Sequence, residues 1–144
     1  MADQDNIDAF NEHVSQTFAL LYGGFPTPVT LSADVYDLSL PDDIDVAMEQ
    51  SKAFEPVAHA IRWLIDEGYV RCREALGDDV FLGAQLTARG LLTLNSVPRS
   101  IDGTGSLGRR MKLALSGGAK HLAGKLAEEA ISAGFQLMTR SMLQ

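Results

Sequence analysis

Apolar residues recur every three or four positions near the start of the chain, which is the period of an amphipathic helix. The stripe consists of Ile7, Phe10, Val14, Phe18, Leu21 and Tyr22. Asp5 or Asn6 is suited to cap this helix, and the pair Gly23-Gly24 ends it. Behind it, the short β-branched run from Val29 to Leu31 predicts one edge strand.

A second helical pattern runs from Ile44 to Glu67 and contains Pro56. Proline is tolerated in the first turn of a helix, but in the interior it removes a backbone hydrogen bond and clashes with the preceding turn. We therefore predict two helices separated by a turn near Ala53 to Glu55, and Gly68 ends the second. The pattern indicates a helix-turn-helix.

Alternating apolar and polar residues follow directly, in Tyr69 to Arg73 and again in Val80 to Leu86. The intervening Gly77-Asp78-Asp79 is typical of a turn, so these segments predict a β-hairpin. The Thr87 hydroxyl is then placed to accept a hydrogen bond from an N–H two or three residues on, which predicts that a helix begins there. In this helix we expect Leu91, Leu92 and Leu94 to face inward.

The C-terminal part of the chain is rich in alanine and leucine. Ser106 can cap a helix that begins at Leu107, and Gly117-Gly118 is expected to break or kink it. The apolar stripe consists of Leu115, Leu122, Leu126, Ala130, Phe135, Leu137 and Met138, and Gly117, Gly124 and Gly134 permit close approach of another helix. The stripe must be buried on the first helix of the same chain or of a partner, or in a membrane interface beside the basic residues of the tail. We favour the first helix and expect a homodimer that uses this stripe as its dimer or partner interface.

The order of these elements resembles a winged helix-turn-helix domain of the bacterial regulator type. The segment "HAIRWLIDEGYVR" is similar to the end of a recognition helix that enters the wing, and "QLTARGLLTL" is similar to the Leu-Thr-x-x-Gly turn that commonly follows the wing. The chain also resembles uncharacterised bacterial and phage winged-helix proteins with C-terminal helices. We therefore expect a mainly α, α+β fold, with a winged-helix domain at 5–98, a linker at 99–106 and a helical extension at 107–142.

The resemblance implies a DNA-binding protein of the transcription-regulator kind. Winged-helix DNA binders place the recognition helix in the major groove and the wing on the backbone or in the minor groove. The implied contacts to double-stranded DNA are Lys52, His59, Arg62, Arg71, Arg73 and Arg89. The same face carries Glu55 and Asp66, and the wing tip is acidic, whereas a DNA-contacting surface gathers lysine and arginine.

The net charge of −7 is unevenly distributed. Residues 1–51 contain ten acidic residues and no lysine or arginine, and residues 52–99 contain six of each sign. Residues 100–144 contain six basic and three acidic residues. This asymmetry supports an alternative function: an acidic winged-helix module for protein–protein interaction, an adaptor or a mimic of nucleic acid, which uses its acidic N-terminal half and its C-terminal helix.

Enzymatic chemistry has little support in the sequence. His13, His59 and His121 lie far apart without cysteine or glutamate at ligand spacing, so we expect no metal site. The glycine-containing stretches lack the pattern of phosphate- or dinucleotide-binding loops, so we expect no cofactor, and no triad order is visible. A ligand pocket between the domain and the tail stays open. The start "MADQDNIDAF" has no signal-peptide character, no apolar run is long enough to span a bilayer, and a single cysteine, Cys72, agrees with a reducing compartment. We expect a cytoplasmic protein that is not an enzyme.

Overall fold

The structure, a computed structural model, describes residues 2–36, 46–96 and 105–143 of the 144-residue chain. Within these residues the helices are α1 (Ala2–Gly24), α2 (Val46–Asp66), α3 (Ala88–Asn95), α4 (Leu107–Ser116) and α5 (Lys120–Leu143), with a 3₁₀ turn, η1 (Ala33–Val35). The strands are β1 (Val29–Leu31), β2 (Val70–Arg71), β3 (Glu74–Leu76) and β4 (Val80–Leu86). The predicted fold class, mainly α with a small β-sheet, is confirmed.

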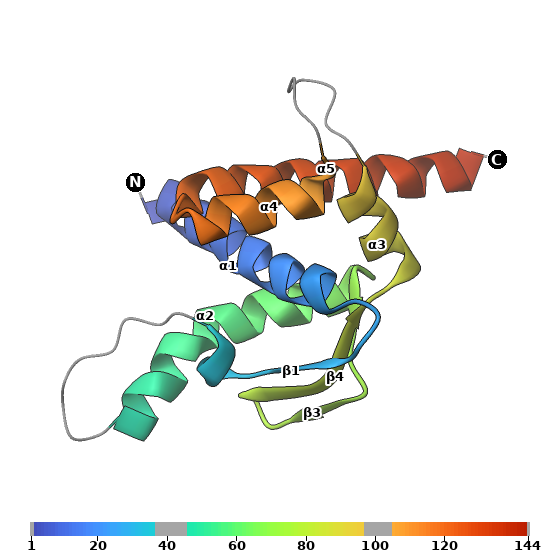
Figure 1. Cartoon of the computed structure of the whole chain (residues 1–144). Coiled ribbons are helices and arrows are strands. Elements are labelled where there is room, and N and C mark those ends of the chain that lie inside the picture. Colours follow the sequence, from blue (N-terminus) through green and yellow to red (C-terminus); the bar gives the residue numbers. More distant parts are fainter. Residues whose placement is uncertain (1, 37–45, 97–104, 144) are drawn as a thin grey trace.

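Helix α1 lies at the centre of the fold. It contacts α4 and α5 on one side and α2 on the other, as Figure 1 shows. Val14 and Phe18, from the predicted apolar stripe, are fully buried in it. The Thr17 side chain shares a buried hydrogen bond of 2.6 Å with the Tyr36 hydroxyl, which ties the residue after η1 to α1. The predicted first helix is therefore confirmed, and both layers of the molecule pack on it, but it begins at Ala2, so Asp5 and Asn6 lie within the helix and do not cap it.

The sheet is antiparallel and is centred on β4. Its strand order is β1-β4-β2, and β3 pairs with β4 beyond β2. The predicted edge strand and hairpin are confirmed, but the first arm of the hairpin is divided into β2 and β3. Between them, the Arg73 N–H still donates to the Leu82 carbonyl at 2.9 Å. Phe81, Ala84 and Leu86 of β4 are buried on the face that packs against the helices.

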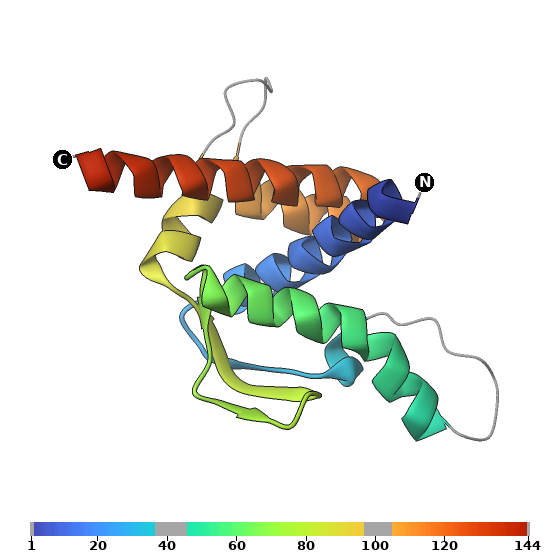
Figure 2. The ribbon, with the colours of Figure 1, turned by 180° about the vertical axis from the view of Figure 1, so that it is seen from behind.

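The predicted turn near Ala53 to Glu55 is wrong, because α2 continues through Pro56. Pro56 lies on the exposed side of the helix, so the carbonyl that it leaves without an intrahelical partner faces water. Phe54 and Val57 are buried, and a continuous helix keeps them on one face with the rest of the core. The first turns of α2 run at an angle to the remainder, as Figure 2 shows.

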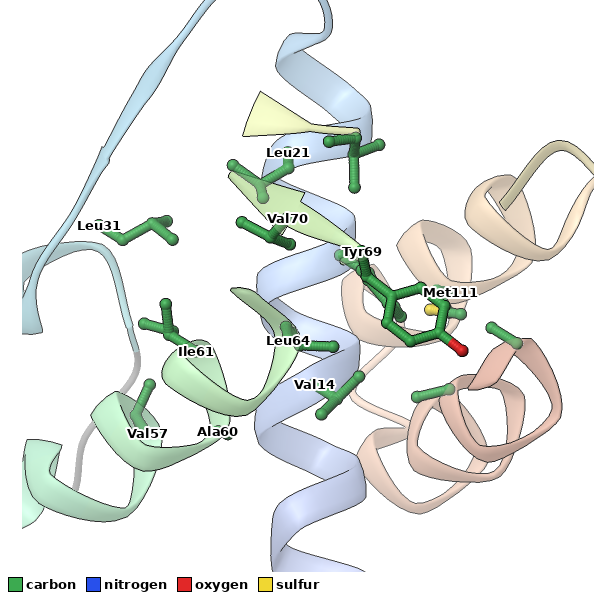
Figure 3. Close-up of a cluster of buried hydrophobic side chains, with 14 of the residues drawn as sticks. Val14, Leu21, Leu31, Val57, Ala60, Ile61, Leu64, Tyr69, Val70 and Met111 are labelled. Atoms are coloured by element: carbon green, nitrogen blue, oxygen red, sulfur yellow. The ribbon is translucent and has the colours of Figure 1, made fainter. Parts of the chain in front are cut away.

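The tail helices share one hydrophobic core with the rest of the chain. Figure 3 shows Leu21 of α1, Ile61 and Leu64 of α2, and Tyr69 close to Met111 of α4. The buried tail residues are Leu107, Met111, Ala114, Ala123, Leu126, Ala127 and Ala130. The tail is therefore buried on the first helix of the same chain, which is one of the sites predicted for it. Most of the predicted linker, residues 99–104, lies outside the described residues.

The predicted helix boundaries in the tail and after the hairpin are confirmed. The Ser106 hydroxyl accepts a hydrogen bond from the Arg109 N–H at 3.2 Å. Helix α4 ends at Ser116, and Gly118, two residues further on, has a φ of +79°. The N–H of Gly118 donates to the Leu115 carbonyl at 3.1 Å, and the N–H of Ala119 donates to Ala114 at 2.8 Å, a Schellman arrangement.

One of the leucines that we expected to face inward does not. Leu94 of α3 is buried, but Leu92 is 60% exposed. The inward face of this two-turn helix is formed by Gly90, Thr93 and Leu94, which are three and four positions apart. Leu92 falls on the opposite face.

Candidate functional site

The end of α2 and the turn between β3 and β4 form a polar surface. We call it the wing-tip surface; it encloses a cavity of about 190 Å³ and is lined by Glu55, Ala58, His59, Arg62, Asp78 and Asp79. The Arg62 guanidinium donates to the Asp78 carboxylate at 3.0 Å and to the Gly77 carbonyl at 3.1 Å. It also lies 5.4 Å from the centroid of the Phe81 ring. Arg62 therefore joins α2 to the hairpin, and its charge is shared with Asp78 of the hairpin turn.

Arg71 and Arg73 lie together on the outer side of the sheet. With Pro28, Cys72, Gly83 and Gln85 they line a second cavity, of about 280 Å³. The Arg71 guanidinium donates to the Gln85 side-chain carbonyl at 3.3 Å, and the Gln85 amide donates to the Pro26 carbonyl. Both arginines are exposed. This outer-sheet surface is the one place where the structure brings two of the predicted DNA-contacting arginines together.

The Arg89 side chain is held by contacts within the protein. Its guanidinium lies 4.3 Å from the centroid of the Tyr69 ring, donates to the Tyr69 hydroxyl at 3.2 Å and donates to the Glu67 carbonyl. Burial raises the pKa of the Tyr69 hydroxyl, and the nearby Arg89 charge partly opposes this rise. Because these contacts orient the guanidinium toward the protein, Arg89 stands apart from the other basic residues.

The six predicted DNA contacts therefore do not form one basic patch. His59 and Arg62 lie among Glu55, Asp78 and Asp79, whereas Arg71 and Arg73 lie on the outer side of the sheet. Lys52 is exposed on α2, ten positions before Arg62, which is roughly 15 Å along a helix.

The predicted interface stripe of the tail is also divided. Leu126 and Ala130 are buried within this chain, so they are not available to a partner, and Leu115 is half-buried. Leu122 is 50% exposed and Phe135 is 61% exposed. The side chains of Leu137 and Met138 lie outside the described residues.

The junction around Tyr69 was not predicted as a site. The Tyr69 hydroxyl donates to the Ile131 carbonyl of α5 at 3.0 Å, and Gly134 of α5 lies directly against the ring. The Thr87 hydroxyl donates to the Gly68 carbonyl at 2.6 Å and accepts from the N–H of Gly90 at 3.0 Å. Gly134 is a signal of this junction in the sequence, because glycine is costly inside a helix. By itself it indicates only that another part of the chain can approach closely.

Gly90 explains the motif that follows the hairpin. A Cβ at this position would lie 2.2 Å from the Tyr69 carbonyl oxygen, so only glycine lets the first turn of α3 approach the backbone between α2 and β2 this closely. The threonine and the glycine of "LTARG" therefore act together: Thr87 caps the helix and Gly90 makes room for the neighbouring backbone.

No group of three or more histidine, cysteine or carboxylate side chains is placed to hold a metal ion in the part of the chain that the structure describes. None of the described helices combines the length and the apolar character that crossing a bilayer requires. Comparisons with protein-family models, curated protein sequences and solved structures gave no significant match to this chain.

Proposed function

We propose that the chain is a winged-helix-like module for protein–protein interaction and that its wing-tip surface binds a basic segment of a protein partner. The strand order β1-β4-β2, with α2 before the hairpin and α3 after it, supports a winged-helix-like arrangement. In such an arrangement α2 is the recognition helix and the β3–β4 turn is the tip of the wing.

The observation that carries the proposal is the excess of carboxylates around Arg62, one of which, Asp78, forms an ion pair with it. The Asp78 side chain is 92% exposed, and Asp79 and Glu55 line the same cavity. A DNA backbone at this surface would meet carboxylates beside the only arginine of the recognition helix. A basic peptide would pair with those carboxylates and leave Arg62 in place.

DNA binding is the second candidate, and it is favoured by the outer-sheet surface. Arg71 and Arg73 are exposed and adjacent there, so they suit contacts to two phosphates. In this alternative the wing side of the sheet, rather than α2, would lie on the duplex.

Two measurements separate the candidates. Fluorescence anisotropy with mixed-sequence duplex DNA at low salt should give no binding for the wild-type chain, and Arg71→Ala should change nothing. Binding that weakens with Arg71→Ala and with added salt would replace the first proposal with the second.

The interaction itself is tested by affinity capture with the full chain as bait. Asp78→Asn combined with Asp79→Asn should lose a bound protein that the wild type retains. Asp34→Asn, which removes an exposed acid of η1, is the matched control and should retain it. A partner that binds all three chains equally would contradict the proposed surface.

We also propose a homodimer. Leu122 on α5 and Leu113 on α4 are half or more exposed, so the tail keeps apolar surface for a second copy although most of its stripe is buried. Light scattering of the full chain should give twice the mass of one chain, and a monomer mass at all concentrations would refute the dimer.

A further inference from the structure

A cavity lies between α1, η1 and the first part of the tail. Its volume is about 340 Å³, within the range of roughly 300–1,000 Å³ that is usual for small-molecule sites. Ala19 and Leu20 of α1, Val35 of η1 and Leu115 of α4 supply apolar walls, together with the Tyr36 ring. None of these residues belongs to the wing-tip or the outer-sheet surface, so the cavity is a separate site.

The charged residues among the described lining residues of this cavity are of one sign. Lys112 of α4 and Lys120, the first residue of α5, both contribute to the lining, and no acid is among the described lining residues. Lys112 also packs beside Gly23, where a Cβ would lie 3.4 Å from its ammonium nitrogen, so its stem is held along α1.

The frame of the cavity is held by hydrogen bonds. Tyr36 is fixed by its hydrogen bond to Thr17. At the end of α4, the Leu115 and Ala114 carbonyls are occupied by the N–H groups of Gly118 and Ala119. The negative end of the α4 dipole is therefore partly compensated next to the cavity, which reduces its opposition to an anion there.

We propose that this cavity binds a small amphipathic anion, a molecule with one carboxylate or phosphate group on an apolar chain of medium length. The apolar walls would remove the chain from water, and the Lys112 ammonium group would pair with the head group. A neutral or cationic analogue with the same apolar chain should bind more weakly, because it has no negative charge to pair with the lysine.

Calorimetric titration of the full chain tests the class of ligand. Decanoate and decyl phosphate are the anionic probes, and decanol and decylamine are the neutral and cationic controls with the same chain. We expect saturable binding of one or both anions with one molecule per chain, decanol weaker by about tenfold, and no binding of decylamine. Binding of one anion alone identifies the head group. No saturable binding of either anion, or equal binding of decanol, would overturn the proposal.

Matched variants test the location. Lys112→Gln keeps most of the stem but removes the charge, and should weaken binding of the anion by about tenfold. Ala19→Leu places a larger side chain in the cavity and should abolish binding. Lys125→Gln is the control, because Lys125 is an exposed lysine of α5 that lines a different cavity. If Ala19→Leu unfolds the chain, the location is tested by the two lysine variants alone. Equal losses of affinity for the anion in Lys112→Gln and Lys125→Gln would then show that the anion binds elsewhere.

Discussion

Helix α5 packs against Tyr69, which lies between α2 and β2, through a contact that only glycine allows. A Cβ on Gly134 would lie 2.4 Å from Cε1 of Tyr69 and 2.5 Å from its hydroxyl oxygen. The Tyr69 ring has little freedom to move away, because Trp63 stacks on it with centroids 6.3 Å apart and Phe18 packs edge-on at 6.0 Å. Arg89 covers it at 4.3 Å. We therefore predict that Gly134→Ala destabilises the fold.

Gly124→Ala is the matched control, because Gly124 is in the same helix but a Cβ there would lie 3.5 Å from Asn11, an ordinary contact. Alanine is favoured over glycine in a helix by about 1 kcal/mol, and both variants gain this term. In Gly134→Ala, overpacking costs about 1–3 kcal/mol. Displacing Tyr69 also weakens its hydrogen bond to the Ile131 carbonyl, which contributes about 1 kcal/mol. The free energies of unfolding of the two variants should therefore differ by about 2–4 kcal/mol.

Urea denaturation followed by circular dichroism measures this difference. The chain has one tryptophan, Trp63, and because it stacks on Tyr69 its fluorescence follows the same contact. In thermal unfolding the two variants should differ in Tm by about 6–12 °C. The reasoning would be refuted if Gly134→Ala were as stable as Gly124→Ala, since both would then have room for a methyl group.

Three further predictions concern the same region and α1. Thr87→Ala removes both hydrogen bonds of the cap and should lower the free energy of unfolding by about 1–2 kcal/mol, whereas Thr87→Ser should retain most of it; equal losses in urea denaturation would contradict the capping role. Arg89→Met should destabilise the chain by about 1–2 kcal/mol through its contacts with Tyr69, without changing duplex affinity in the anisotropy assay; an unchanged stability with reduced affinity would instead make Arg89 a DNA contact. Desolvation by burial lowers the pKa of His13 below its usual value, although Glu12 opposes this. The unfolded chain therefore binds a proton more readily than the folded chain, so the free energy of unfolding should fall as pH is lowered through about 6.5, and His13→Gln should flatten that part of the profile between about pH 7.5 and pH 5.5.

Local signals in the sequence predicted most of the elements correctly because the physics behind them is local. The stripe of α1, the β-branched run of β1 and the caps at Thr87 and Ser106 each depend on residues within one or two turns. The error at Pro56 has the opposite origin. Proline disfavours a helix interior locally, but burial of Phe54 and Val57 on one face outweighs the lost hydrogen bond on the exposed side.

The arrangement of the candidate sites could not be predicted from such local signals. Whether Arg62 faces solvent or an acid depends on the hairpin folding back over α2, which brings Asp78 within 3.0 Å across sixteen positions. The contact of Tyr69 with Gly134 joins positions still further apart. The cavity beside Lys112 depends on the tail packing in cis on α1, and the sequence allowed that packing in trans as well.

The free energy of the Arg62–Asp78 ion pair is too small for this pair alone to exclude DNA from the wing-tip surface. An exposed ion pair of this kind contributes little, so a phosphate could displace Asp78 from Arg62 at small cost. The obstacle to DNA is what remains after that exchange, because Asp78, Asp79 and Glu55 would all stay beside the phosphates, and Arg62 is the only lysine or arginine among the described residues that line this surface. A basic peptide meets the same three carboxylates as attractive groups and needs no exchange at Arg62. The excess of carboxylates at this surface, more than the ion pair itself, therefore favours a protein partner over DNA.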